Sequence, residues 1–167
     1  MGADLSQINI LTRREIEARI AGPLINVFIE DFGRDKVLGV VNRVIRSLAH
    51  ESGAQLAKQM GGNSMADFAK GLSAWGAGDA YEMEVLELSE DKYFFNMTRC
   101  RYADMYNELG MADLGIVLSC ARDFQLVEGF NPRMKLIRTK TIMEGHDHCD
   151  FRITLVNGGL QYRNCAT

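Results

Sequence analysis

The sequence predicts an α+β fold in which a twisted antiparallel sheet of about four strands carries helices on one face, after a helical N-terminal third. Three observations lead to this prediction. Apolar residues recur at helical spacing through residues 1–62. The apolar period then changes to two, and two pairs of alternating segments follow, each joined by a short polar turn. Successive hairpins favour an antiparallel sheet with helices packed against one side.

The N-terminal region predicts two long helices and a shorter one. Thr12 and Glu15 form a capping box at the start of the first helix. Pro23 lies inside the apolar repeat of that helix, so we expect a kink or a break there. The second helix should end at the glycine pair 61–62, and a third helix should follow around residues 64–74.

The C-terminal part predicts two hairpins separated by helices. The expected elements, in chain order, are strands at 81–85 and 93–98, helices at 101–109 and 112–127, a loop at 129–132, and strands at 134–143 and 149–156. A turn with Gly145 and Asp147 joins the last two strands.

Length and composition predict one globular domain. The chain has 167 residues, of which 47% are hydrophobic and 25% are charged, as in ordinary folded proteins. We expect a single domain over residues 1–167. Within it, residues 1–62 form the N-terminal helices, residues 63–156 form the α+β core that carries the site, and residues 157–167 form a tail.

Charge and hydropathy exclude several functional classes. The formal net charge is −3 and no basic cluster with interleaved aromatic residues occurs, which excludes nucleic acid as a partner. No signal-peptide core or membrane-spanning apolar run is found, so we expect a cytoplasmic protein without membrane contact. The four cysteines should therefore be reduced. The apolar N-terminal helices make a homodimer a reasonable expectation.

Cys120 and Asp123 form the first candidate cluster. They lie three residues apart on an expected helix and so share one face. Asp123 could act as a general base, a metal ligand or an activator of the thiol. The alternative is a buried cysteine beside an aspartate that pairs with Arg122, Arg138 or another cation, and residue types alone favour this alternative.

The second cluster is the segment from Glu144 to Asp150, which carries six ionisable or metal-ligating side chains in seven positions. His146 and His148 have the spacing that puts two imidazoles on one side of an extended chain, and Cys149 could add a thiolate ligand for zinc or another divalent metal. Strand alternation opposes this set, because Cys149 falls on the core face and His148 on the other. A bulge would lift that restriction.

Further polar residues are candidates for substrate binding. Thr139 and Thr141 fall on one apolar face of the expected strand and could line a pocket, or they could simply favour a strand. Arg101 and Tyr102, at a strand-to-helix junction, could hold a substrate carboxylate together with Asp104. A local ion pair between Arg101 and Asp104 on the helix surface is the simpler explanation of the same residues.

The segment from Arg101 to Arg152 resembles the L-2-amino-thiazoline-4-carboxylic acid hydrolase family. Ordered, closely spaced motifs over about a third of the chain carry the resemblance: Arg101-Tyr-Ala-x-Met-Tyr106, Leu109-Gly110, Asp113-Leu-Gly115, Cys120-x-x-Asp-Phe124, Gly129-Phe-Asn-Pro132, Leu136-x-Arg-Thr139, Thr141-Ile-Met-Glu-Gly145 and His148-Cys-Asp-Phe-Arg152. A shorter resemblance, over Glu144-Gly-x-x-x-Cys-x-Phe, is to vinyl-reductase-type small-molecule-binding domains.

The family resemblance implies hydrolysis of a cyclic C=N bond in a thiazoline amino acid, which opens the ring to N-carbamoyl-cysteine. It also implies that Cys120, Asp123, His148 and Cys149 occupy recurrent positions of the family, whereas His146 does not. The vinyl-reductase resemblance implies a twisted antiparallel sheet with helices on one side and allows a binding module without catalysis.

These observations lead to one principal hypothesis, a hydrolase for a small cyclic amidine, imine or lactam. Its expected groups are Asp123 or Glu144 as base, His148 for proton transfer and Arg138 or Arg101 for a substrate carboxylate, with Thr139, Thr141, Tyr102 and Asn131 also in contact with substrate. Direct attack by Cys120 or Cys149 is a second variant. Zinc held by Cys120, Asp123, His148 and Cys149 is a third. A non-catalytic binding domain, or an isomerase or lyase with the same residues, remains an alternative.

Overall fold

The computed structural model describes residues 8–75 and 79–156. Its elements, in chain order, are α1 (Ile10–Phe32), α2 (Arg34–Met60), α3 (Met65–Trp75), β1 (Tyr81–Leu88), β2 (Lys92–Cys100), α4 (Arg101–Glu108), α5 (Ala112–Gly115), the π-helical turn η2 (Ile116–Cys120), α6 (Arg122–Phe130), β3 (Met134–Ile137), the 3₁₀ turn η3 (Ile142–Glu144) and β4 (Cys149–Leu155). The expected tail, 157–167, lies outside the described residues.

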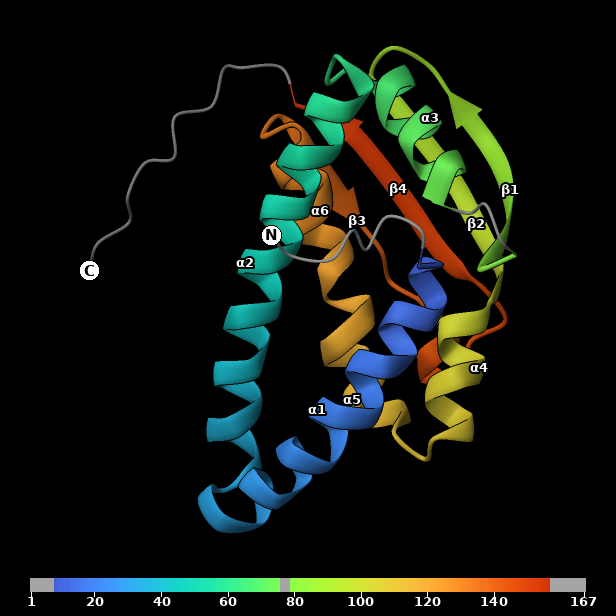
Figure 1. The fold of residues 1–167 in the computed structure, drawn as a ribbon. Helices are drawn as coiled ribbons and strands as arrows, with labels where there is room; N and C mark the ends of the chain where they lie inside the picture. The colour runs from blue at the N-terminus through green and yellow to red at the C-terminus, as the bar shows by residue number, and fades with distance from the viewer. Residues whose placement is uncertain (1–7, 76–78, 157–167) are drawn as a thin grey trace, which may run out of the picture.

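The four strands form one antiparallel sheet, which confirms the predicted α+β class. Their order is β1-β2-β4-β3. Each predicted hairpin pairs within itself, β1 with β2 and β3 with β4, and the two hairpins join where β2 pairs with β4. Figure 1 shows the hairpin of α1 and α2 reaching away from this sheet. No helix among the described residues is long and apolar enough to cross a membrane.

The main core lies between the sheet and helices α2, α3 and α6. In β4, the side chains of Cys149, Phe151 and Ile153 are buried, as the alternation of the sequence predicts. Phe151 pairs across the sheet with Phe95 of β2, and their rings stack with centroids 4.7 Å apart. Because the buried side chains of β2 and β4 point to the same side, the helices cover only this face of the central strands.

Helices α2 and α6 cross at two glycines that face the partner's backbone. A Cβ on Gly53 of α2 would overlap the Leu126 carbonyl and lie 2.7 Å from the Phe130 nitrogen. A Cβ on Gly129 of α6 would similarly overlap the His50 carbonyl of α2. Since both obstacles are backbone atoms, no side-chain rearrangement can create the missing space, and the crossing depends on glycine at both positions.

The start of α1 differs from the predicted capping box. The helix begins at Ile10, and the side chain of Asn9 accepts a hydrogen bond from the Leu11 N–H at 2.8 Å. Glu15, the expected partner of Thr12, instead pairs with Arg19 one turn later. Helix α1 also continues through Pro23 without a break.

The expected strand 134–143 ends early, at Ile137, because side chains replace its ladder hydrogen bonds. The backbone N–H groups of Thr139 and Lys140 donate to the Asp150 carboxylate at 2.8 and 2.6 Å. The Ile142 N–H donates to the Cys149 sulfur at 3.2 Å. Thr141 then caps the turn η3 by accepting from the Glu144 N–H at 3.1 Å. The segment therefore curls toward α6 instead of following β4.

The predicted helix 112–127 contains an irregularity that the apolar pattern of the sequence does not predict. Between α5 and α6 the chain forms the π-helical turn η2, closed by the Ala121 N–H donating to the Ile116 carbonyl at 2.9 Å. Such turns hold one residue more than an α-helical turn and are frequent at functional sites.

We expect Gly53→Ala and Gly129→Ala each to destabilise the protein, by about 1–3 kcal/mol or more, because the added methyl group meets backbone on the facing helix. The measurement is the free energy of unfolding from denaturant titration. Gly39→Ala is the matched control. It also lies in α2, but a Cβ there meets nothing within 4 Å. This change should stabilise the protein by about 0.5–1 kcal/mol. Equal effects at Gly39 and Gly53 would contradict the proposed role of the crossing.

Candidate active site

A buried ion pair links the end of β3 to the start of α6. The Arg138 guanidinium donates to the Asp123 carboxylate and, through its other terminal nitrogen, to the Cys120 carbonyl at 3.1 Å. The Arg138 side chain is only 6% exposed, whereas that of Asp123 is 38% exposed. The guanidinium lies 5.1 Å from the ring centroid of Phe124 and 5.2 Å from that of Phe151. Both rings attract the cation, and this cation–π attraction is stronger because the buried guanidinium has little hydration.

This pairing bears out one of the alternatives that the sequence left open for Asp123, a partnership with Arg138. The π-helical turn contributes to it, because η2 ends at Cys120 and presents that residue's carbonyl to the guanidinium. Burial raises the pKa of the Asp123 carboxyl above its ordinary value, although the Arg138 charge acts in the opposite direction.

The three described cysteines are poorly suited to be nucleophiles in this state. Burial raises the pKa of the Cys120 thiol, and the nearby Asp123 carboxylate raises it further. Burial also raises the pKa of Cys149, and it raises that of Cys100 to about 11. Because the thiolate is the reactive form, direct attack by Cys120 or Cys149 at neutral pH needs a base that first removes the proton.

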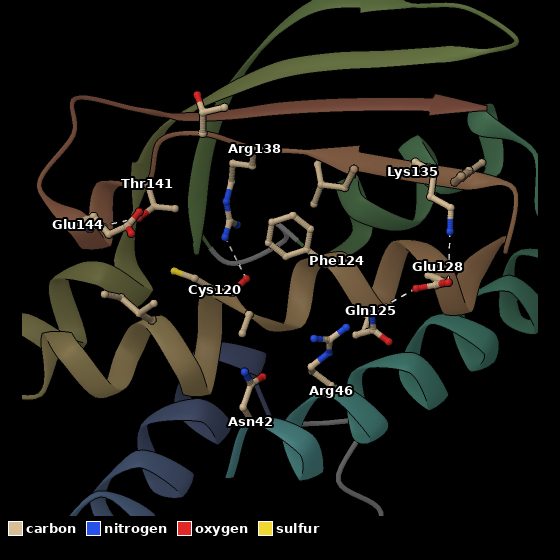
Figure 2. Close-up of a pocket in the computed structure, with 15 residues that line it drawn as sticks. Asn42, Arg46, Cys120, Phe124, Gln125, Glu128, Lys135, Arg138, Thr141 and Glu144 are labelled. Carbon is tan, nitrogen blue, oxygen red and sulfur yellow. Dashed lines mark hydrogen bonds and ion pairs between the residues drawn. The ribbon is translucent and has the colours of Figure 1, made fainter. Parts of the chain in front are cut away.

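A pocket of about 600 Å³ opens beside this pair, between α2, η2, α6 and β3. We call it the α2–α6–β3 pocket. Figure 2 shows Arg138 pointing from the end of β3 toward Cys120, with Phe124 beside it. The predicted site residues that line the pocket are Cys120, Arg138, Thr139, Thr141 and Glu144. Its volume is in the range of small-molecule sites.

One end of the pocket carries a carboxylate that is held in place. The Thr141 hydroxyl donates to Glu144 Oε2 at 2.6 Å, within the turn η3. Thr141 itself is buried, whereas Glu144 is exposed. Asp150 anchors the preceding loop through Thr139 and Lys140. Burial alone would raise the pKa of Asp150, but these hydrogen bonds hold it below its ordinary value. The Asp150 carboxylate is therefore charged at neutral pH.

Helix α2 supplies two polar residues that the sequence interpretation missed. Asn42 and Arg46 line the pocket from the side opposite β3 (Figure 2). The Asn42 side-chain oxygen is buried without a hydrogen-bond partner among the described residues. Within the same residues the Arg46 guanidinium forms no hydrogen bond or ion pair. Their i, i+4 spacing was the available signal, because it puts both on one helix face.

Four other lining residues were also missed: Phe124, Gln125, Glu128 and Lys135. The Lys135 ammonium donates to the Glu128 carboxylate at 3.2 Å, and Gln125 donates to the same carboxylate at 3.2 Å. These polar groups therefore satisfy one another at the end of the pocket away from Glu144 (Figure 2).

Several predicted site residues do not line this pocket. The His148 ring bonds to the neighbouring Asp147 carboxylate at 2.8 Å. Asn131 is buried and closes a loop by donating to the Asn63 carbonyl at 2.9 Å. Arg101 is exposed, and burial raises the pKa of the Tyr102 hydroxyl to about 12. His148, Asn131, Arg101 and Tyr102 are therefore not part of the pocket lining.

The predicted zinc set is not assembled. In the described ranges 8–75 and 79–156, no group of three or more His, Cys, Asp and Glu side chains could hold a metal ion. The structure does not bring Cys120, Asp123, His148 and Cys149 together as one group. Strand alternation gives the reason, because it buries Cys149 beneath the sheet while His148 pairs with Asp147 in the turn before β4.

The model of the family described as L-2-amino-thiazoline-4-carboxylic acid hydrolase matches residues 13–153. The chain belongs to this family. The match spans both the N-terminal helices and the residues around the α2–α6–β3 pocket, and it confirms the resemblance seen in the sequence. Among curated proteins, none matches the chain significantly.

Two solved structures are similar to this family member. The phenol-responsive sensory domain of the transcription activator PoxR, solved with phenol, is 14% identical with a TM-score of 0.52. The alignment covers 81% of this chain and 72% of that one. A trafficking protein particle complex subunit 3 from Naegleria fowleri, covalently bound to palmitic acid, is 13% identical with a TM-score of 0.49. The alignment covers 87% and 96% of the two chains. The first likeness shows a shared fold.

We expect Asp123→Asn to increase the alkylation rate of Cys120 roughly tenfold at mildly alkaline pH. Removing the carboxylate charge lowers the pKa of the thiol, and one pKa unit changes the thiolate fraction tenfold. The measurement is the rate of iodoacetamide labelling, followed at the Cys120 peptide by mass spectrometry. Asp113→Asn is the control, because Asp113 forms an exposed pair with Arg34. An unchanged rate in Asp123→Asn would show that Asp123 does not suppress the thiolate.

Proposed function

We propose that the protein is a hydrolase that opens a small cyclic substrate of the 2-aminothiazoline-4-carboxylate type in the α2–α6–β3 pocket. The observation that carries the proposal is the composition of this pocket in a member of the hydrolase family. A positioned carboxylate, Glu144, and an arginine without a partner among the described residues, Arg46, line the same small-molecule-sized space. Ring opening of such a substrate needs a base for water and a cation for the substrate carboxylate.

Glu144 is the base in this proposal. The Asp123 carboxylate is already engaged by Arg138, whereas Glu144 binds only the Thr141 hydroxyl and its own turn. As water adds to the amidine carbon, Glu144 accepts its proton. Glu144 passes this proton to the ring nitrogen. The bond from the carbon to the ring sulfur then breaks as the added hydroxyl group becomes the carbonyl, and Glu144 transfers the hydroxyl proton to the sulfur, which leaves as a thiol. The single product carries one carbamoyl group and one thiol, and it contains all the atoms of the substrate and the water.

Arg46 binds the substrate carboxylate, and Arg138 acts mainly as a positioning residue. Two of the five Arg138 N–H groups are used by Asp123 and the Cys120 carbonyl. Such a tethered guanidinium is rigid, which favours a fixed hydrogen-bond donor at one wall of the pocket. No residue of the ranges 8–75 and 79–156 uses the donors of Arg46, which extends from α2 toward the pocket (Figure 2). Bidentate pairing with a carboxylate would orient the ring toward Glu144.

A binding function without catalysis is the second candidate. The observation in its favour is the apolar part of the lining, which includes Ile116, Phe124, Met134 and Leu136. Such a lining holds a small apolar or aromatic ligand equally well. A ligand that binds tightly but is recovered unchanged would favour this candidate over the hydrolase.

We expect Glu144→Gln to lower kcat by about 10²–10⁴-fold, the usual contribution of a general base. Arg46→Gln should instead raise KM by roughly 10–100-fold, because it removes charge-assisted hydrogen bonds. The measurement is turnover of 2-aminothiazoline-4-carboxylate, followed by related amidines and lactams. Glu84→Gln, an exposed carboxylate of β1, is the matched control. A Glu144→Gln variant with the wild-type kcat would contradict this assignment of the base.

We also propose that a second copy of the chain covers the tip of the α1–α2 hairpin. Large apolar side chains remain exposed there, namely Ile20, Leu24, Val27, Phe28, Phe32, Val40 and Val44. Together they expose on the order of 600 Å², so two copies would bury about 1,200 Å², the lower range of specific interfaces. Two hairpins packed in this way would form a four-helix bundle.

We expect the protein to be a dimer at micromolar concentration and Phe28→Glu to convert it to a monomer, because a buried unpaired charge opposes association. The measurement is light scattering coupled to size-exclusion chromatography. Leu86→Glu is the control, since Leu86 is equally exposed but lies on β1. A wild-type monomer would refute the proposed interface.

A further inference from the structure

A second cavity, of about 460 Å³, lies between α1, α2, α4 and the start of α6. The turn η2 separates it from the α2–α6–β3 pocket, because Leu118 lines the second cavity whereas Cys120 lines the first. It lies toward the sheet end of the hairpin. Along α1, Arg14 at this cavity is about 20 Å from Phe28 at the tip, at 1.5 Å per residue.

Arginines dominate the charge of this cavity, which we call the arginine cavity. Arg13, Arg14 and Arg122 line it, against two carboxylates, Glu17 and Glu51. The chain as a whole has a formal net charge of −3, so the sign of this cavity is opposite to that of the protein. Because the lining has one more arginine than carboxylate, the cavity has an excess positive charge, which attracts anions.

Two of these arginines differ in their hydrogen-bond and ion-pair partners. Arg14 pairs with Glu17 at 2.5 Å, one helical turn away. The Arg122 guanidinium forms no hydrogen bond or ion pair with any residue in the described ranges. It is partly buried, and burial together with the Arg14 charge lowers its pKa. Glu17 and Asp123 raise the pKa of Arg122, but within the described ranges neither forms an ion pair with it, so its desolvation is only partly offset.

The remaining walls indicate the kind of ligand. Tyr106 is almost fully buried and lines the cavity together with Arg14 and Arg122. Ala18, Ile45 and Leu118 add apolar surface. A cationic end with apolar walls, in a space within the range of small-molecule sites, fits a small organic anion.

We propose that the arginine cavity is a second ligand site, which binds a small organic anion through its carboxylate or phosphate group between Arg14 and Arg122. The site is independent of the hydrolytic pocket. Its ligand neutralises the Arg14–Arg122 repulsion and fills the apolar walls with the rest of the molecule. Arg122 is a ligand-binding residue here, and Tyr106 contributes a wall.

The test is an amide NMR titration of the full chain at neutral pH and low salt, with inorganic phosphate and with benzoate as separate probes. We expect shifts at the amides of Ala18, Ser52 and Leu118 that saturate at millimolar probe and weaken with added salt. Arg122→Gln should weaken this binding at least about tenfold, and Arg122→Lys, which keeps the charge, should weaken it less. A response to phosphate alone, benzoate alone or both would assign the chemistry of the ligand.

Arg46→Gln is the matched control, because Arg46 lines the other pocket. It should leave the shifts at Ala18, Ser52 and Leu118 unchanged. If Arg122→Gln does not fold, Arg14→Gln replaces it with the same expectation. The proposal is overturned if neither probe shifts these amides, if Arg122→Gln binds as wild type does, or if all shifts gather at Thr141 and Glu144. Since the readout is binding at named amides, a failure of the hydrolase proposal leaves this result interpretable.

Discussion

Helices α2 and α6 approach each other so closely at Gly53 and Gly129 that neither position has room for a Cβ. This backbone contact determines how far α6 lies from α2 and, through the sheet, where β3 runs. Both cavities depend on it. Asn42 and Arg46 reach one pocket, and Ile45 and Ser52 reach the other, only because α2 is held against α6 along its length.

The Arg138–Asp123 pair then links this helical layer to the sheet. A guanidinium between two aromatic rings, tied to a carboxylate and a backbone carbonyl, has little freedom to move. It draws the segment after β3 toward α6, where Asp150 and Thr141 fix the following turn. The result is a pocket with a rigid cationic wall and a carboxylate near the solvent, while burial raises the thiol pKa of the three described cysteines. Acid–base chemistry suits such a site better than thiolate chemistry.

Patterns confined to one element were predictable from the sequence. The alternation in 149–155 gave the buried face of β4, and the three-residue spacing of Cys120 and Asp123 brought both toward Arg138. The end of β3 was not predictable, because Asp150, eleven residues from Thr139, takes over its backbone hydrogen bonds. Arg46 was missed for a similar reason. Its place in the pocket depends on a crossing of α2 with α6 that hydropathy does not encode.

The histidines and cysteine of segment 144–150 do not share one face of the chain. Local composition says which ligands are available but not which face of the chain each one takes. In the structure, Cys149 enters the core, and the ring of His148 turns to Asp147. Glu144, the residue of this segment that we propose as the base, is held in place by the Thr141 hydroxyl and not by the neighbouring histidines.

The π-helical turn η2 has a consequence for how the family can vary in length. Each residue of an α-helix rotates the chain by about 100°, so deleting one position between Ile116 and Ala121 would restore a regular helix and turn everything after it by that angle. Asp123 would then leave Arg138, and Arg122 would leave its cavity. Gly129 would leave its crossing with α2 as well. The length of this turn therefore couples the packing of α6 on α2 to the positions of both polar sites.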